Sequence, residues 1–134
     1  MKHPSHALNP APARWTLAIG WTLLLTLFLL QPEAEPLIDL GLPRGESTLQ
    51  RELFFSALHL LAFALTCFIW FWTIHSALTL GRRLLAAVLI AISLGIVTEA
   101  LQSLTLDRHA SLIDLIANIA GALVAARLIW QRYK

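Results

Sequence analysis

Four long apolar runs, separated by short polar segments, constrain this chain more than any other feature. They cover approximately residues 15–31, 53–75, 84–103 and 111–130. A helix that crosses the hydrocarbon core of a membrane needs about 20 mostly apolar residues, and each run is close to that length. Backbone groups inside lipid have to bond within the chain, which restricts such runs to helices. The sequence therefore predicts an all-α integral membrane protein, a bundle of four transmembrane helices.

The composition agrees with this fold class. Hydrophobic residues make up 57% and charged residues 13% of the 134 residues, and the mean hydropathy is +0.69. A soluble domain carries about 25% charged residues. The net charge is only +2, and no basic run is interleaved with aromatic residues, which argues against a nucleic-acid partner. We treat residues 1–134 as one membrane domain.

The first apolar run has two interpretations, an uncleaved span and a signal peptide. Its uncharged part, residues 15–30, is short for a membrane span. However, the segment that follows reads QPEAEP, which contains no pair of small residues typical of a cleavage site. We therefore favour an uncleaved span.

Local signals mark where two of the later helices begin. Residues 47–50, STLQ, have the form of a capping box, so the second helix is expected to start there. Ser111 followed by Asp114 resembles the capping pair that opens a helix, which predicts the start of the fourth span.

Lysine and arginine are distributed unevenly between the two sides of a four-span chain. The side that carries both termini holds Lys2, Arg14, Arg82, Arg83, Arg127, Arg132 and Lys134, whereas the other side holds Arg44, Arg51 and Arg108. Loops rich in lysine and arginine stay in the cytoplasm. The distribution therefore predicts that both termini are cytoplasmic.

Polar residues from three spans are expected to meet in one layer of the outer leaflet. Helical rise places His59 about 9 Å and Glu99 about 8 Å from the outer boundary. Asp114 and Asn118 lie about 5 and 10 Å along the fourth span. Charged groups within a membrane are costly unless paired, so Arg108, in the adjoining loop, is the expected partner of Glu99 or Asp114.

The third and fourth spans also carry ridges of small residues at four-residue steps. Such ridges let transmembrane helices approach closely. The positions on the third span are Ala87, Ala91 and Gly95, and those on the fourth are Ala117, Gly121 and Ala125. We expect Gly95 and Gly121 to be helix-packing positions.

The segment 99–121, EALQSLTLDRHASLIDLIANIAG, resembles the signature of VanZ-like membrane proteins. The shared features are Glu-x-x-Gln at the end of the third span, an arginine in the loop, and Asp-x-x-x-Asn-x-x-Gly in the fourth span. His59, in SALHLLAF, resembles the family's histidine early in the second span. The resemblance covers roughly residues 15–130. It implies a multi-pass protein of the bacterial plasma (inner) membrane that acts at the cell envelope. The family's namesake is associated with low-level resistance to the glycopeptide teicoplanin.

Two functions follow as hypotheses. In the first, the polar layer binds or acts on an envelope lipid or a glycopeptide-related precursor. Its candidate catalytic residues are His59, Glu99 and Asp114, and its candidate binding residues are Gln102, Arg108, Ser111 and Asn118. In the second, the chain is a non-catalytic accessory subunit of a larger membrane complex, and the polar residues form a structural clasp. The expected partners are accordingly membrane lipids or such a complex.

The sequence leaves open whether any reaction is catalysed. It contains no nucleophile elbow, no glycine-rich phosphate loop and no recognised metal-ligand spacing. We therefore expect no cofactor and no metal, although His59, Glu99 and Asp114 together could hold a divalent ion. Haem ligation by His59 and His75 is disfavoured, because the two lie about 24 Å apart along one helix. A channel is disfavoured because the polar groups stop in the outer leaflet.

Overall fold

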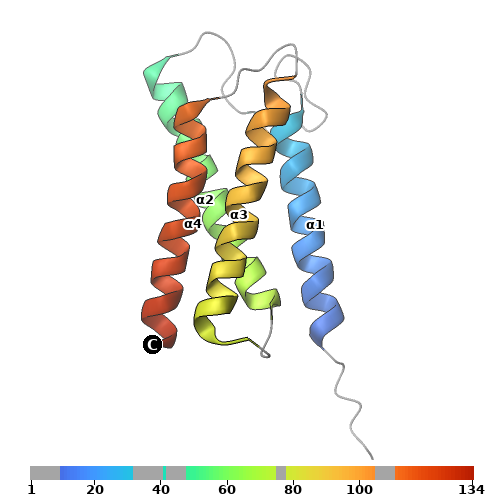
Figure 1. Cartoon of the computed structure of the whole chain (residues 1–134). Helices are drawn as coiled ribbons and strands as arrows, with labels where there is room; N and C mark the ends of the chain where they lie inside the picture. Colours follow the sequence, from blue (N-terminus) through green and yellow to red (C-terminus); the bar gives the residue numbers. More distant parts are fainter. Residues whose placement is uncertain (1–9, 32–40, 42–47, 75–77, 105–110) are drawn as a thin grey trace, which may run out of the picture.

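A computed structural model of the chain describes residues 10–31, 41, 48–74, 78–104 and 111–134. Four helices account for nearly all of these residues and lie side by side along a common direction (Figure 1). Each is long and apolar enough to cross a membrane, and the described ranges contain no strand. The helices are α1 (Pro10–Leu30), α2 (Leu49–Thr73), α3 (Leu80–Gln102) and α4 (Leu112–Tyr133). The predicted four-helix membrane bundle is thereby confirmed.

The helix starts follow from local capping chemistry. The side chain of Thr48 accepts a hydrogen bond from the backbone N–H of Arg51 at 3.2 Å, so α2 begins within the predicted capping segment 47–50. Ser111 caps α4 in the same way. Pro10 occupies the first position of α1, where its missing N–H removes no helical hydrogen bond.

Helices α2 and α3 lie in the middle of the bundle, and α1 and α4 flank them. Both α2 and α3 contact every other helix, whereas α1 and α4 do not touch each other within the described residues. Figure 1 shows α4 and α1 on opposite sides of α3, with α2 behind. Helices α1 and α4 therefore each pack against the α2–α3 pair.

The two glycines expected at helix contacts lie where neighbouring helices come close. A Cβ on Gly121 would collide with the carbonyl oxygen of Leu60 and lie 3.1 Å from the backbone nitrogen of Ala64, both on α2. A Cβ on Gly95 would lie 3.1 Å from the Cβ of Asn118 and 3.2 Å from a ring carbon of Phe63. The crossing of α2 and α4 thus depends on the missing side chain of Gly121.

Small residues fill the part of the core beyond this crossing. Cys67, Phe71 and Ile129 pack there against four buried alanines, Ala87, Ala91, Ala122 and Ala125. Alanines leave room for close helix approach, and long side chains project outward instead. Leu23, Leu61, Leu89 and Leu128, for example, are each more than half exposed. This arrangement, with small residues inside and leucines outside, is typical of a bundle surrounded by lipid, where an exposed leucine carries no free-energy penalty.

Two reciprocal hydrogen bonds attach α1 to α2. The indole N–H of Trp21 donates to the hydroxyl of Thr66 at 2.9 Å, and the indole N–H of Trp70 donates to the hydroxyl of Thr22 at 3.1 Å. Each helix thus supplies one donor and one acceptor. Because both indoles are satisfied, the tryptophans can pack within the bundle, where an unpaired N–H would be costly.

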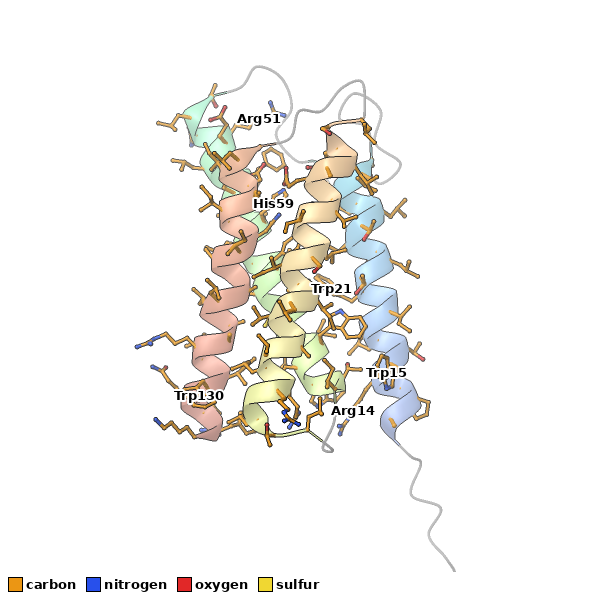
Figure 2. All side chains as sticks on the ribbon, in the orientation of Figure 1. Arg14, Trp15, Trp21, Arg51, His59 and Trp130 are labelled. Carbon is orange, nitrogen blue, oxygen red and sulfur yellow. The ribbon has the colours of Figure 1, made fainter. Side chains whose placement is uncertain are left out.

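The N-terminal end of α1 and the C-terminal end of α4 lie at the same end of the bundle (Figure 1). Arg14 and Trp130 are at this end, and His59 and Arg51 lie toward the opposite one (Figure 2). Here Arg83 donates to the backbone oxygens of Ile74 and Phe71, at 2.7 and 3.1 Å. Its positive charge therefore stabilises the carbonyl end of α2.

Candidate functional site

The start of α4 is held by two neighbouring helices. The hydroxyl of Ser111 accepts a hydrogen bond from the backbone N–H of Asp114 at 3.2 Å, as an N-cap does. In a capping box, the acidic side chain at this third helical position would reach back to the N–H of the cap residue. Here the N–H of Ser111 instead donates to Oε2 of Glu99, on α3, at 3.0 Å. A carboxylate from another helix has replaced the local one.

This replacement leaves the carboxylate of Asp114 available for a contact with α2. The hydroxyl of Ser56 donates to Oδ1 of Asp114 at 2.8 Å. Glu99 is buried, with 5% of its surface exposed, and Ser56 and Asp114 are half-buried. The start of α4 is therefore bonded to α3 through Glu99 and to α2 through Asp114.

One turn further along, a histidine and an asparagine meet between α2 and α4. Nδ1 of His59 and Oδ1 of Asn118 lie 2.9 Å apart. With the Asn118 amide in this orientation, its oxygen faces the ring and only accepts, so Nδ1 carries the proton and donates. In the neutral ring Nε2 then holds the free lone pair. This contact leaves Nε2 as the nitrogen of His59 that can accept a further hydrogen bond.

The histidine–asparagine pair is almost completely enclosed. The exposed fraction is 8% for His59 and zero for Asn118. The ring of His59 lies parallel to that of Phe63, with the ring centroids 6.5 Å apart. On the other side Asn118 contacts Gly95 of α3, as described above. Nδ2 of Asn118 is buried and has no hydrogen-bond partner within the described ranges.

The side chain of Gln102 forms a hydrogen bond with α1. Its side-chain nitrogen Nε2 donates to the backbone oxygen of Leu29 at 2.8 Å, and its exposed fraction is 5%. Leu29 lies in the last turn of α1, where carbonyl groups have no partner within the helix. Gln102 therefore provides a donor for a carbonyl group at the C-terminal end of α1.

The structure brings most of the predicted site residues into one polar layer, which we call the α4 polar layer. It consists of Ser56, His59, Glu99, Ser111, Asp114 and Asn118. Arg108, the expected partner of the carboxylates, lies outside the described residues. So does His75, the second histidine of the haem hypothesis.

Ser56 is the member of this layer that was not among the candidates predicted from the sequence. It precedes His59 by three positions and so lies on the same face of α2. That spacing places its hydroxyl toward the bundle, but a serine in an apolar helix commonly bonds to its own backbone. Its contact with Asp114 depends on the close crossing of α2 and α4.

The contacts of the α4 polar layer limit the chemistry that it can perform. Ser56 bonds to Asp114 and His59 bonds to Asn118, so the described hydrogen bonds do not link serine, histidine and carboxylate in series as a catalytic triad requires. His59, Glu99 and Asp114 also do not form a metal-binding group, and no set of three such ligands occurs in the described part of the chain.

Comparison with known proteins adds no further information. No protein-family model, curated protein or solved structure was found to match the chain.

Proposed function

We propose that this chain is a VanZ-like protein of the bacterial plasma membrane whose α4 polar layer binds the polar head of an envelope lipid or a glycopeptide-related precursor. The membrane orientation that we propose has both termini in the cytoplasm. Three arginines, Arg14, Arg83 and Arg132, belong to the helix ends that lie together at one end of the bundle, whereas Arg51 lies at the other. The polar layer then belongs to the outer leaflet, where envelope precursors are used.

The observation that carries this proposal is the unsatisfied amide of Asn118. A cluster that serves only to join helices is expected to satisfy its buried polar atoms, because an unpaired donor in an apolar interior is destabilising. Nδ2 of Asn118 is buried without a partner in the described ranges, and the Nε2 of His59 also makes no hydrogen bond there. A buried donor that the helices leave unused favours a site that a ligand completes.

The surroundings of the layer suit an amphiphile better than a soluble molecule. Leu53 at the start of α2 and Leu112 and Ile116 at the start of α4 are all more than half exposed. In a membrane these side chains face acyl chains, directly beside the polar residues. A lipid can therefore place its head in the layer while its tails remain in the bilayer.

The test is lipid retention by the purified chain. The wild-type protein, extracted from bacterial membranes in mild detergent, is expected to carry a bound lipid in native mass spectrometry. Asp114→Asn is expected to carry less, and Thr98→Val to carry the wild-type amount, because the buried hydroxyl of Thr98 bonds only within its own helix. Unchanged teicoplanin tolerance in cells carrying Glu99→Gln or Asp114→Asn, at equal expression, together with no bound lipid, would refute the proposal.

A second function, as an accessory subunit of a larger membrane complex, is favoured by a separate observation. The side-chain hydrogen bonds described above for Glu99, Ser56 and His59 all join different helices, as a clasp would. A stoichiometric partner protein in a mild-detergent pull-down, without bound lipid, would support this function over the first. Reporter fusions at each terminus test the orientation on which the first one depends.

A further inference from the structure

In the α4 polar layer, one side-chain atom each of His59, Asp114 and Asn118 makes no hydrogen bond within the described ranges. They are Nε2 of His59, Oδ2 of Asp114 and Nδ2 of Asn118. The three residues are close neighbours, since Asp114 and Asn118 are one turn apart on α4 and His59 bonds directly to Asn118. The three atoms therefore belong to one small group of residues between α2 and α4.

The three atoms differ in what they offer a ligand. Nε2 of His59 accepts, because the proton is on Nδ1 opposite the Asn118 oxygen. Oδ2 of Asp114 also offers lone pairs that can accept. Nδ2 of Asn118 donates. The layer therefore presents two acceptors and one donor to a ligand.

This combination distinguishes between the common classes of lipid head. A phosphodiester accepts but does not donate, so it leaves Nε2 and Oδ2 unused, and any anionic phosphate is repelled by the carboxylates of Asp114 and Glu99. An ammonium group donates but does not accept, and the phosphate that carries it in a phospholipid head is repelled by the same carboxylates. A hydroxyl group both donates and accepts. Neighbouring hydroxyls can thus bond to all three atoms, directly or through one bridging water.

We propose that the α4 polar layer recognises a hydroxyl-rich, uncharged head group, that of a glycolipid or another polyol-bearing amphiphile. This inference rests on the proposed lipid-binding function and specifies its ligand class. Hydroxyls donate to His59 and Asp114, and a hydroxyl oxygen or its bridging water accepts from Asn118. Asn118 also acts as a positioning residue, because its Oδ1 holds the histidine in the tautomer that accepts.

The experiment compares head groups on the full-length wild-type chain. Nanodiscs of phosphatidylcholine, whose head has no donor, are doped in turn with monoglucosyl diacylglycerol, phosphatidylethanolamine or phosphatidic acid carrying the same acyl chains. Lipids that remain bound after release from the nanodisc are counted by native mass spectrometry. Preferential retention of the glucosyl lipid supports the inference. Equal or greater retention of either phospholipid overturns it but leaves the proposed function standing, whereas retention of no lipid overturns both.

Variants then locate the bound head. Asp114→Asn keeps an oxygen that can accept from Ser56 but replaces the second acceptor with a donor, so glucosyl-lipid retention is expected to fall about tenfold. Thr98→Val, at a buried position that bonds only within α3, is the matched control and should retain the lipid fully. An equal loss in both variants, or in neither, would place the lipid elsewhere. If Asp114→Asn does not fold, the wild-type head-group series still decides the ligand class.

Discussion

The backbone N–H of Ser111 donates to the carboxylate of Glu99 at 3.0 Å, so the N-cap residue of one transmembrane helix is bonded to a side chain of the preceding helix. This bond fixes the position of α4 along the bundle axis as well as its start. It also frees Asp114 for Ser56 of α2. Because Glu99 rather than Asp114 bonds to the Ser111 N–H, hydrogen bonds connect α4 to both α3 and α2.

Removing the carboxylate of Glu99 is expected to destabilise the bundle. Glu99→Ala leaves the Ser111 N–H without its acceptor, which should lower the free energy of unfolding by about 1–3 kcal/mol. Glu99→Gln keeps a side-chain oxygen that can accept, so its loss should be smaller. Denaturant titration in detergent micelles, followed by circular dichroism, measures both. Equal stability of the alanine variant and wild type would show that the bond contributes nothing.

Ser56 and Asp114 are expected to be coupled energetically. A double-mutant cycle with Ser56→Ala and Asp114→Ala should give an interaction free energy of about 0.6 kcal/mol, with an upper limit near 1.7 kcal/mol, the range of hydrogen bonds between membrane helices. Thr98→Val combined with Ser56→Ala serves as the uncoupled control pair. A cycle that closes to zero for both pairs would contradict the Ser56–Asp114 bond in the folded protein.

Gly121→Ala should be among the most damaging single substitutions in this bundle. The added methyl group meets the backbone of Leu60 and Ala64, which cannot rotate away as a side chain can. A loss of about 1–3 kcal/mol or more is expected. Gly20→Ala is the matched control, because nothing lies within 4 Å of the added atom, and its helical position should make it neutral or stabilising by up to about 1 kcal/mol. Similar unfolding curves for the two variants would exclude a tight α2–α4 crossing.

The tautomer of His59 can be observed directly. Nitrogen NMR of the histidine-labelled chain should show Nδ1 protonated and Nε2 unprotonated, with the signal identified by its absence in His59→Gln. Asn118→Leu removes the acceptor and should abolish this preference. A His59 protonated at Nε2 in the wild-type protein would contradict the assignment and remove the acceptor on which glycolipid recognition depends.

The indole bonds predict how firmly α1 is attached. Trp21→Phe keeps an aromatic ring but removes the donor to Thr66, so stability should fall by about 0.6 to 1.7 kcal/mol. Trp130→Phe is the control, since Trp130 is 41% exposed and its indole makes no hydrogen bond within the described ranges. Equal effects of the two substitutions would show that ring size matters more than the bond.

The sequence was sufficient to predict the helices and the layer, but not the bonds within it. Hydropathy and helix length identify the four spans because lipid allows few other structures. The positions of His59, Glu99 and Asn118 predict a shared layer because helical rise is constant. Which groups form hydrogen bonds within the layer depends on how the helices cross, and the periodicity of the sequence carries no information about helix crossing.

The start of α4 illustrates this limit. The pair Ser111 and Asp114 predicts a local capping box, and half of it forms. The other half is taken by Glu99, because the α3–α4 packing brings that carboxylate to the Ser111 N–H. Gln102 lies one turn from Glu99, and this position predicts that it belongs to the binding site. In the structure its side chain bonds to Leu29 of α1.

The hydrogen bonds that α4 makes with α2 also have a consequence for biogenesis. The four helices leave the ribosome in order, and α4 follows the others into the bilayer. Until it arrives, Ser56 and His59 lack the partners that they have in the folded chain, and their polarity is exposed to a lipid environment. Insertion of α4 supplies both of these bonds in one step, so the polar groups of α2 are covered only when the last helix is in place.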